Sequence, residues 1–325
     1  PGKKLKIIGI TGTKGKTTTA NFIWTVLNNN GHKCGLVGTA NIRIGDNERL
    51  NKYHMTMPGH FILQKLLKEM VDAKCEYVVL EVTSEGIKRF RHFGLKFNTA
   101  IFTNLTPEHL PSHNNSFENY KSTKAKLFKT CPNLIIANVD DSHASYYLNN
   151  QCGQKITFSI KNQSDYQAKI IDFSNFELNN FKYSLNILGK INIYNAIPAI
   201  ILGEKLGISP KNIQKSFDKL VSIPGRMEFI PNKLGLQIIV DYAHEPVSLK
   251  ELLQTAQDFT PKNNKIILLL GAEGGGRDPA KRAPMGDLAN KYADFAIVTN
   301  VDPYQDDPQI IANDIAVRID KNKLY

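Results

Sequence analysis

Short apolar runs alternate with stretches of helical periodicity along the first part of the chain. The apolar runs are rich in β-branched residues and predict strands at residues 5–10, 76–82, 97–102 and 133–139. The stretches between them predict helices at residues 16–30, 60–73 and 116–129. Strands that alternate with helices in this way indicate a parallel sheet with helices on both faces.

The pattern changes twice farther along the chain. Short alternating segments at 154–188 predict an antiparallel appendage, and helices are predicted after it at 192–207 and 210–221. The segment Ser222-Ile223-Pro224-Gly225 then breaks the pattern, and a new α/β series follows, with strands predicted at 236–241, 265–270 and 294–299. We therefore expect a first domain at residues 1–222 and a second at residues 223–325.

Composition excludes several classes of protein. The 325 residues are 42% hydrophobic, which suffices for two domains with cores of their own. The formal charge of +11 comes from lysines spread over the whole length without a dense basic run, so we expect no nucleic-acid partner. No apolar run approaches 18 residues and no charged-then-apolar leader opens the chain, so neither a membrane span nor a signal peptide is expected.

The spacing of the four cysteines argues against a metal-binding module. None of them forms a CxxC pair, so their spacing argues against a zinc ribbon. Cys34 and Cys75 lie in apolar segments and are expected to be buried thiols in a reducing compartment, which for this chain means the cytoplasm.

The strongest chemical signal is the stretch from Thr11 to Thr19, TGTKGKTTT, between a predicted strand and a predicted helix. Its glycines permit tight turns and a close approach of the backbone to phosphate, and the helix that follows presents its first amides. Lys16 can reach the β- and γ-phosphates, and the Thr17 hydroxyl can bind magnesium. We therefore expect ATP and Mg²⁺ to bind here, with contacts from Gly12, Thr13, Lys14, Gly15, Lys16, Thr17 and Thr18.

The predicted strand at 76–82 carries a carboxylate near its end. Glu81 lies at its carboxyl end, and ligands of open α/β sheets bind at that edge. Glu81 can hold the same magnesium ion as Thr17. A surface or capping role is the alternative for a strand-end glutamate, but the phosphate loop upstream favours the metal.

This form of the loop resembles that of the Mur ligases and of their relatives, the folylpolyglutamate and cyanophycin synthetases. Pro224-Gly225-Arg226-Met227-Glu228 and Asp241-Tyr242-Ala243-His244-Glu245-Pro246 are similar to the PGRME and DYAHxP motifs of the MurE-type branch. Further family motifs resemble residues 80–84, 103–113, 120–128 and 271–282. The resemblance implies an α/β fold, with a P-loop central ATPase domain around a mostly parallel sheet and a C-terminal Rossmann-like α/β domain.

The resemblance also implies roles for individual residues. Those implied in catalysis are Lys16, Lys124 and His109. Those implied as magnesium ligands are Thr17, Glu81, His109 and, if carbamylated, Lys124. Further nucleotide contacts are implied at Asn192, Asn195, Arg226, Asp241, Tyr242 and His244. Substrate contacts are implied at Thr56, Pro58, Ser84, Arg91, Arg277 and Asp302.

Two of these roles have ordinary alternatives. Lys124 can be a solvated lysine on a helix, and Asn192 can be a helix N-cap residue. Positive potential that faces the substrate is also expected from Arg277, Lys281 and Arg282.

The implied reaction is ATP-dependent amide-bond formation through an acyl phosphate. It joins a free amino acid to a UDP-muramoyl-peptide-like acceptor in cell-wall peptidoglycan synthesis, with ATP between the two domains. One alternative is another Mur-type ligase of the cyanophycin, folylpolyglutamate or MurT-like amidating kind, although the four-cysteine insert of the last is lacking. A second alternative is a non-catalytic module that binds a nucleotide.

The sequence departs from the family pattern at several places. Neither the N-terminal UDP-binding domain nor the GKGHE segment is found, so the second domain is expected to be truncated. Lys14 replaces a common asparagine, and Glu85 replaces a histidine. The DNPR motif of diaminopimelate-adding enzymes aligns with Val301-Asp302-Pro303-Tyr304, which lacks the arginine and so disfavours diaminopimelate; Asp302 favours a cationic side chain such as that of lysine.

Overall fold

The computed structural model describes residues 1–53, 55–108, 110–276 and 278–325, and it divides the chain into two compact units. Unit 1 is Pro1–Glu228 and unit 2 is Phe229–Tyr325. The division comes after residue 228 rather than after residue 222, because the intervening segment folds onto unit 1. Ile223 is fully buried there, and the Arg226 Nη2 atom donates to the Thr17 hydroxyl at 3.4 Å.

Unit 1 is built on a nine-stranded sheet of order β4-β3-β2-β5-β1-β6-β7-β8-β9. All neighbours from β2 to β9 are parallel, whereas β3 and β4 add an antiparallel hairpin at one edge. The central strands are buried on both faces, which explains their continuous apolar runs. The strands are β1 (Lys6–Thr11), β2 (Cys34–Val37), β3 (Asn41–Ile44), β4 (Asn47–Leu50), β5 (Tyr77–Glu81), β6 (Phe97–Phe102), β7 (Leu134–Asn138), β8 (Gln154–Ser159) and β9 (Tyr166–Gln167).

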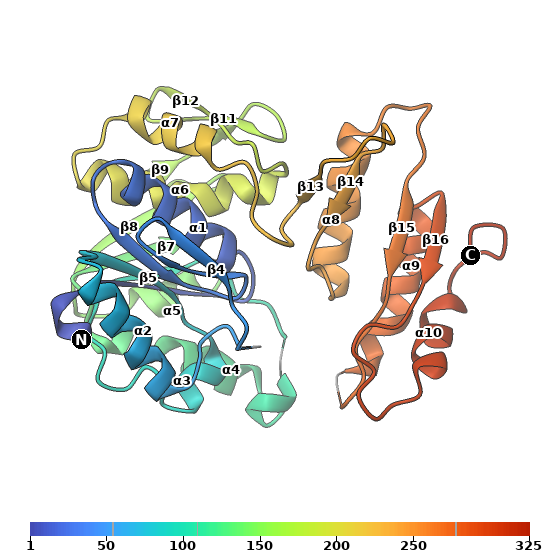
Figure 1. Ribbon diagram of the computed structural model, residues 1–325, viewed down its shortest axis with the longest axis horizontal. Coiled ribbons are helices and arrows are strands. Elements are labelled where there is room, and N and C mark those ends of the chain that lie inside the picture. The colour runs from blue at the N-terminus through green and yellow to red at the C-terminus, as the bar shows by residue number, and fades with distance from the viewer. Residues whose placement is uncertain (54, 109, 277) are drawn as a thin grey trace. The chain divides into compact units, whose positions relative to one another are not determined.

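Helices cover both faces of this sheet, as the sequence predicted (Figure 1). One face carries α1 (Lys16–Asn29), α6 (Lys190–Lys205) and α7 (Pro210–Lys219). The other carries α2 (His60–Asp72), α3 (Ser84–Lys88), α4 (Phe117–Ala125), α5 (Ala144–Leu148) and the short 3₁₀ turns η1 (Gly2–Lys4), η2 (Leu110–His113) and η3 (Phe128–Thr130). Helix α1 packs against α6 and α7, with the Phe22 and Phe217 rings 5.2 Å apart.

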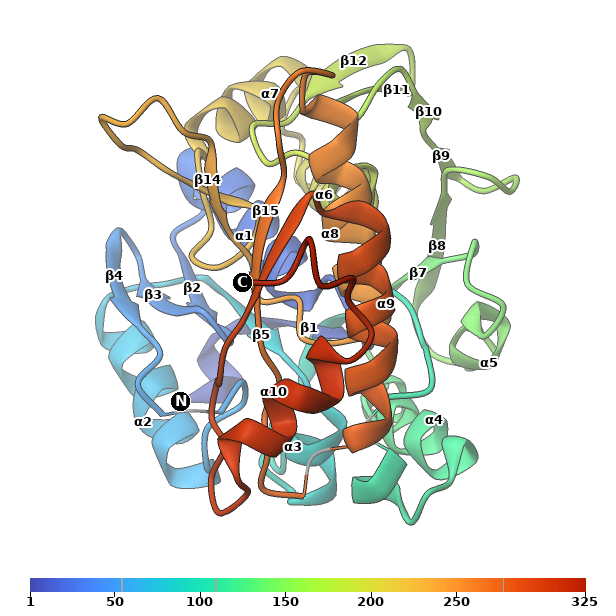
Figure 2. The same ribbon diagram turned by 90° about the vertical axis from the view of Figure 1, so that its right-hand side faces the viewer.

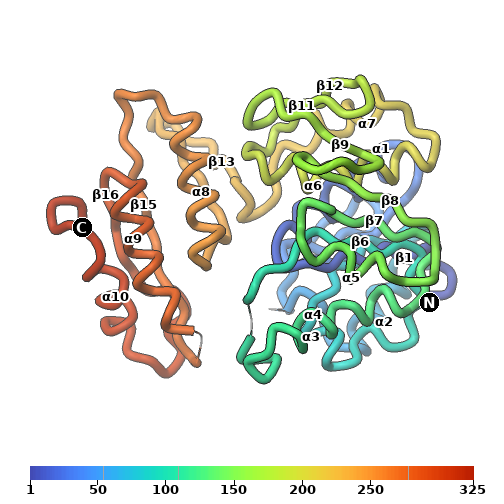
Figure 3. Tube along the Cα trace, turned by 180° about the vertical axis from the view of Figure 1, so that it is seen from behind, coloured from blue at the N-terminus to red at the C-terminus, as the bar shows by residue number. Residues whose placement is uncertain are grey.

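The predicted antiparallel appendage at 154–188 is only partly correct. Strand β8 instead extends the main sheet and runs parallel to β7 (Figure 3). The antiparallel sheet begins later, with β10 (Lys169–Ile170), β11 (Asn175–Leu178) and β12 (Phe181–Ser184). Ile156 and Phe158 of β8 are buried, and α6 packs against the strand, so tertiary packing decides its partner. The β3–β4 hairpin was not predicted, because β4 is polar and exposed.

Unit 2 contains the predicted α/β series. Strands β15 (Ile267–Leu270) and β16 (Phe295–Val298) are parallel, and β13 (Glu228–Ile230), at the junction of the two units, pairs with β14 (Ile238–Val240). Helices α8 (Pro246–Phe259) and α10 (Pro308–Ala316) both pack on α9 (Arg282–Tyr292), which follows η4 (Pro279–Lys281) (Figure 2). Their shared core includes Leu249, Leu253, Met285, Ile311 and Ile315. The opposite face of β15 is exposed, since Ile267 and Leu269 are each 65% accessible.

The cysteines follow the expectation in part. Cys34 and Cys75 are buried and carry no disulfide, as predicted. Cys131 and Cys152 form a disulfide that joins the end of η3 to the segment before β8, and this bond was not anticipated. Disulfides are uncommon in reducing compartments, so this bond does not agree with the reducing compartment inferred from Cys34 and Cys75. In the described ranges, every helix is too short or too polar to cross a bilayer.

Candidate functional site

The phosphate loop is shaped by close packing at its two glycines. Residues 12–15 join the end of β1 to the start of α1, the arrangement that the motif requires. Gly15 has φ of 81°, and a Cβ atom there would strike the side chain of Asn195. A Cβ atom at Gly12 would strike the Thr103 hydroxyl. Glycine is therefore required at both places by segments distant in the sequence.

The segment after β6 holds the loop in shape. The Thr13 amide donates to the Asn104 carbonyl oxygen at 2.9 Å, and the Lys14 amide donates to the Asn104 Oδ1 atom at 2.9 Å. The Thr103 hydroxyl donates to the Lys14 carbonyl oxygen at 2.7 Å. The Thr106 amide donates to the Thr13 hydroxyl at 2.9 Å. Residues 103–106 thus fix the loop before any ligand arrives.

Two lysine ammonium groups converge on one carbonyl oxygen of the loop. Lys16 Nζ and Lys124 Nζ each donate to the Gly12 carbonyl at 2.8 Å, and Lys16 also donates to the Thr13 carbonyl at 2.8 Å. Burial lowers the pKa of both lysines, and for Lys124 the nearby Lys16 charge adds to the effect. Lys124 is only 2% exposed, so the solvated-helix alternative is wrong. An anionic phosphate would relieve this concentration of positive charge.

Glu81 lies at the carboxyl end of β5, is fully buried at 0% exposure and interacts electrostatically with Lys16. Its carboxylate accepts from the Thr17 hydroxyl at 3.0 Å, the Thr39 hydroxyl at 3.0 Å and the Thr39 amide at 2.8 Å. The surface or capping alternative for Glu81 is therefore wrong. A buried carboxylate beside a hydroxyl is the oxygen donor set that Mg²⁺ prefers, so Thr17 and Glu81 fit such an ion.

Thr39 was missed by the sequence analysis, because no motif surrounds it. It follows Gly38, where a Cβ atom would strike the Glu81 carboxylate. Its position just after β2, next to β5 in the sheet, is the signal that could have identified it.

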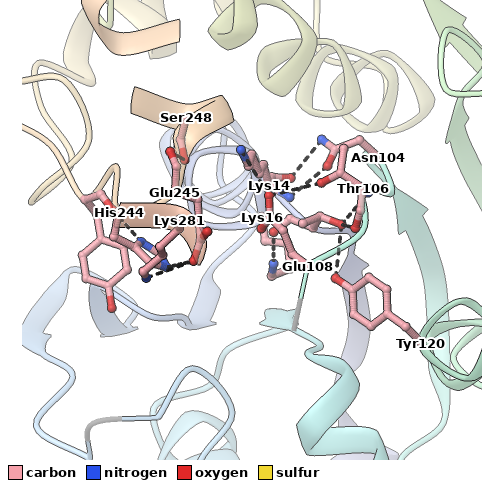
Figure 4. A network of polar contacts seen from close by, with 12 residues as sticks. Lys14, Lys16, Asn104, Thr106, Glu108, Tyr120, His244, Glu245, Ser248 and Lys281 are labelled. Atoms are coloured by element: carbon pink, nitrogen blue, oxygen red, sulfur yellow. Dashed lines mark hydrogen bonds and ion pairs between the residues drawn. The ribbon is translucent and has the colours of Figure 1, made fainter. Parts of the chain in front are cut away.

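Lys14 pairs with a carboxylate of unit 1. Figure 4 shows Lys14, Lys16, Thr106, Glu108 and Tyr120 around the loop. The Lys14 Nζ atom lies 3.2 Å from the Glu108 carboxylate, which also accepts from the Thr106 hydroxyl at 3.2 Å. The Tyr120 hydroxyl is 3.1 Å from the Thr13 hydroxyl, and its ring centroid is 4.7 Å from Lys124 Nζ. Thr18, the remaining residue predicted in the loop, is buried in the first turn of α1.

The two asparagines of α6 are buried beside the loop. The Asn195 amide donates to the Asn192 Oδ1 atom at 3.0 Å, and the Asn192 amide donates to the Leu188 carbonyl at 2.7 Å. The N-cap alternative for Asn192 is wrong, because Gly189 holds that position. Thr19 also lies near, with its hydroxyl 3.5 Å from the Asn195 Oδ1 atom.

The substrate residues predicted in unit 1 fall into two groups. The Thr56 hydroxyl is 2.9 Å from the Thr39 hydroxyl. Arg91 Nη1 donates to the Met57 carbonyl at 2.6 Å, so Arg91 contacts the segment that carries Thr56 and the buried Pro58. Ser84 forms the second group, with its hydroxyl 3.0 Å from His113 Nε2. Burial lowers the pKa of His113, which favours a neutral imidazole beside Ser84.

The nucleotide residues predicted in unit 2 share one turn after β14. The Asp241 carboxylate accepts from the Ala243 amide at 2.8 Å. The His244 Nδ1 atom lies 2.9 Å from the Tyr242 carbonyl oxygen, and the two rings are 5.0 Å apart. Tyr242 is exposed.

The expected positive potential of Lys281 and Arg282 is not found. Both side chains are buried and paired with acids. Lys281 Nζ lies 3.1 Å from the Glu245 carboxylate (Figure 4), and Arg282 Nη1 lies 2.8 Å from that of Asp314. Their charges are therefore neutralised within unit 2, and packing of α9 explains why they are buried.

Of the remaining predicted site residues, the structure describes only Asp302. Asp302 is exposed, and its carbonyl oxygen accepts from the Gly274 amide at 3.0 Å, which joins the loop after β15 to the loop after β16. His109 and Arg277 lie outside the described residues. Within the described ranges, no cluster of three or more His, Cys, Asp or Glu side chains can hold a metal.

Comparison with known proteins covers both units. The family profile for the Mur ligase middle domain matches residues 10–203, and that for the Mur ligase, glutamate ligase domain matches residues 225–324. The UDP-N-acetylmuramoyl-L-alanyl-D-glutamate--2,6-diaminopimelate ligase of Clostridium botulinum is 40% identical over 332 residues, which cover 99% of this chain and 67% of that protein. The enzyme of the same name from Parabacteroides distasonis is 36% identical, with 99% and 66% covered. The chain thus spans about two thirds of the length of these relatives.

Solved structures agree with the sequence relatives. A structure of a ligase of that same name has 29% identity and a TM-score of 0.70, with 98% of this chain and 67% of that chain covered. MurF from Acinetobacter baumannii shares the fold at 20% identity, with a TM-score of 0.74 and coverage of 99% and 67%. With the phosphate loop, Glu81 and both units matched, the chain belongs to the Mur ligase family.

Proposed function

We propose that this chain carries out ATP-dependent amide-bond formation, which joins an amino acid to the carboxylate of a UDP-muramoyl-peptide-like acceptor. The observation that carries the proposal is the convergence of Lys16 and Lys124 on the Gly12 carbonyl, together with the buried Thr17–Glu81 pair, whose carboxylate interacts with Lys16. The curated relatives are named for a ligation of this kind.

The residues of unit 1 would act by charge neutralisation and positioning. ATP phosphates would replace the Gly12 and Thr13 carbonyls as partners of Lys16, and the first amides of α1 would face them. Mg²⁺ held by Thr17 and Glu81 would neutralise charge on the β- and γ-phosphates. Arg226, which reaches the Thr17 hydroxyl, would add a further cation at the same place.

The chemistry then needs no nucleophilic serine or cysteine. A carboxylate oxygen of the acceptor attacks the γ-phosphorus, the bond to the bridging oxygen breaks, and ADP and an acyl phosphate result. The amine of the amino acid attacks the acyl carbon, and the tetrahedral intermediate expels phosphate. Preorganised cations and amides stabilise the charge that develops in both steps.

Lys124 would take part as a carbamate. Its lowered pKa enlarges the fraction of neutral amine, and a neutral amine adds to carbon dioxide to give an N-carboxylate. That product replaces a buried cation with an oxygen ligand close to the phosphate loop, which suits a hard metal ion.

The loop after β16 bears on which amino acid is added. The relatives carry 2,6-diaminopimelate in their names, whereas this chain has Tyr304, which is 62% exposed, where the diaminopimelate motif has arginine. Among the described residues, no ion pair engages Asp302. An amino acid with a cationic side chain, such as lysine, is favoured on this ground.

The proposal is tested by magnesium-dependent release of phosphate from ATP, with UDP-muramoyl-dipeptide as acceptor and each amino acid offered in turn. Release is expected only when both the acceptor and one amino acid are present. Lys16→Ala should lower the rate by about 100-fold or more, and Lys3→Ala, at an exposed lysine, should not. A wild-type rate in Lys16→Ala would overturn the proposal. Absence of release with every pair, alongside measurable ATP binding, would favour the non-catalytic nucleotide-binding module.

A further inference from the structure

A single side chain, that of Thr39, joins the buried carboxylate of the site to the segment that carries Thr56. Thr39 follows β2 and is partly exposed, as is Thr56, whereas Glu81 is fully buried. The Thr39 hydroxyl lies 3.0 Å from Glu81 Oε2 and 2.9 Å from the Thr56 hydroxyl. Thr39 is therefore in direct contact with a residue that fits Mg²⁺ and with a residue predicted to bind the substrate.

The direction of this chain of hydrogen bonds follows from the number of hydrogens in it. A threonine hydroxyl carries one hydrogen and two lone pairs, whereas an ionised carboxylate can only accept. Thr39 therefore donates its hydrogen to Glu81, and the Thr56 hydroxyl donates to the Thr39 oxygen. In this arrangement the Thr56 oxygen has only its lone pairs left for a ligand.

Glu81 has little spare capacity for a cation while these donors stay in place. The Thr17 and Thr39 hydroxyls both donate to Glu81 Oε2, and the Thr39 amide donates to Oε1 at 2.8 Å. A carboxylate offers about four lone-pair sites, so most of them are already used. Charge withdrawn from Oε2 by a cation at Glu81 would weaken the hydrogen bond from Thr39. The Thr39 hydrogen could then turn to Thr56, and the Thr56 hydrogen to a ligand.

A second link holds the two hydroxyls close together. The Asn51 Nδ2 atom donates to the Gly38 carbonyl oxygen at 2.7 Å and to the Met55 carbonyl oxygen at 2.9 Å. Gly38 precedes Thr39 in the chain, and Met55 precedes Thr56. The contact between the two hydroxyls is thus supported by the backbone on both sides and does not depend on side-chain rotamers alone.

We propose that Thr39 is a positioning residue that couples Mg²⁺ at Glu81 to the acceptor at Thr56. When Glu81 holds no metal, the hydroxyls point toward its carboxylate. When Glu81 holds Mg²⁺, the chain reverses and Thr56 donates to a carboxylate or carbonyl oxygen of the acceptor. Mg²⁺ and the acceptor therefore strengthen each other's binding. This inference rests on the proposed function, which supplies the acceptor.

The coupling is measured by binding rather than by turnover. UDP-muramoyl-dipeptide is titrated calorimetrically into the full chain with a saturating non-hydrolysable ATP analogue, once with Mg²⁺ and once with a chelator. The ratio of the two dissociation constants, the magnesium factor, is expected to be about fivefold or more. By reciprocity, the acceptor must lower the Mg²⁺ concentration for half-saturation by the same factor.

Substitutions separate coupling from a purely structural role, which would weaken acceptor binding equally with and without Mg²⁺. Thr39→Val keeps the shape and the amide but removes the hydroxyl, and should lower the magnesium factor about threefold or more. Thr39→Ser keeps the hydroxyl and should keep the factor. In the Thr39→Val background, Thr56→Val should lower the factor no further, because both substitutions break the same chain.

The matched control is Thr130→Val. Thr130 is also partly exposed, and its hydroxyl donates to the Leu127 carbonyl oxygen at 2.6 Å, away from the Thr39–Thr56 contact. This variant loses a hydrogen bond of the same kind and should leave the magnesium factor unchanged.

Two results would overturn the proposal. One is the wild-type magnesium factor in Thr39→Val, and the other is a Thr39→Ser protein with the factor of Thr39→Val. If Thr39→Val does not fold, Thr56→Val breaks the chain at its other end, and an unchanged factor there overturns the proposal equally. Absence of acceptor binding to the wild-type chain in both conditions is a different result, because it contradicts the proposed function and this inference together.

Discussion

At the scale of single residues, the site depends on charged groups held out of water. Glu81 is fully buried and accepts three hydrogen bonds from Thr17 and Thr39. Lys124 is buried near Lys16, with a like charge next to it. Such an arrangement is costly in an empty protein and favourable once a cation joins Glu81 and an anion joins the lysines.

Replacement of Glu81 by glutamine tests its role toward the metal. Glu81→Gln keeps the shape but removes the negative charge, so the Mg²⁺ concentration for half-maximal phosphate release should rise about tenfold or more. The matched control is Glu76→Gln, at an exposed glutamate paired with Lys6. An unchanged magnesium dependence in Glu81→Gln would refute the assignment.

The lowered pKa of Lys124 leads to a prediction about how the unfolding free energy depends on pH. Its folded pKa lies well below the unfolded value near 10.4, so between these two values the unfolded chain binds more protons and the unfolding free energy rises with pH. Below the folded pKa both states are protonated, and the whole penalty of the buried charge is present. Lys124→Met should therefore stabilise the protein at neutral pH by roughly 1–3 kcal/mol and flatten this rise.

The measurement is urea denaturation from pH 6 to pH 10 in buffer freed of carbon dioxide, which keeps Lys124 as an amine. Lys126→Met, at an exposed lysine next to the same helix, is the control and should change neither the stability nor its slope. A Lys124→Met protein less stable than wild type at neutral pH would contradict the prediction.

At the scale of elements, the site lies where the carboxyl ends of three strands and the first turn of α1 come together. The carboxyl ends of β1, β5 and β6 bring the phosphate loop, Glu81 and residues 103–106 to one edge of the sheet. Helix α6 packs along α1 and presses Asn195 against Gly15. The shape of the phosphate loop therefore depends on its contacts with residues 103–106 and with Asn195 of α6, as well as on its own glycines.

A double-mutant cycle measures the contact between α6 and the loop. Gly15→Ala should destabilise the protein through the left-handed backbone and through the collision with Asn195. In an Asn195→Ala background only the backbone strain remains, so the cost of Gly15→Ala should fall by about 1 kcal/mol. Unfolding free energies of the four proteins in urea give the coupling. Equal costs in the two backgrounds would show that Asn195 does not constrain Gly15.

At the scale of the whole molecule, the chain has two units with separate cores. The core of unit 1 includes buried residues of β1, β5, α2 and α4, and that of unit 2 lies between its helices and β15–β16. Residues Ser222–Glu228 belong to unit 1 although they resemble the start of the second domain in sequence. Each unit can therefore unfold by its own cooperative transition.

Calorimetry of the full chain tests this independence. Leu253→Ala removes a buried side chain of unit 2 and should cost about 2–5 kcal/mol, which lowers one transition only. Val26→Ala, in α1, should lower the other transition only. Mg²⁺ with ATP is expected to raise the transition that Val26→Ala lowers. A single transition that both substitutions lower would show that the two cores unfold together.

Much of the site follows from local sequence. A β-branched run, two glycines, Lys16 and Thr17 ahead of a helical pattern already determine a phosphate loop, because strand, turn and helix form from neighbouring residues. The same reasoning placed Glu81 at a strand end and predicted the alternation of strands and helices, although it missed the β3–β4 hairpin and assigned β8 to the wrong sheet. Motif resemblance supplied Lys124, Asn192 and Asn195, whose chemistry alone predicted nothing unusual.

Tertiary structure decided what depends on residues far apart in the chain. It buried Lys124 against the Gly12 carbonyl, brought Thr39 to Glu81, joined β8 to the main sheet and neutralised Lys281 with Glu245. It also joined the Thr39 and Thr56 hydroxyls. The local sequence pattern reflects secondary-structure propensity and periodicity. Burial and charge pairing arise only when distant segments pack together. Burial and charge pairing in turn control side-chain pKa values, metal affinity and ligand choice.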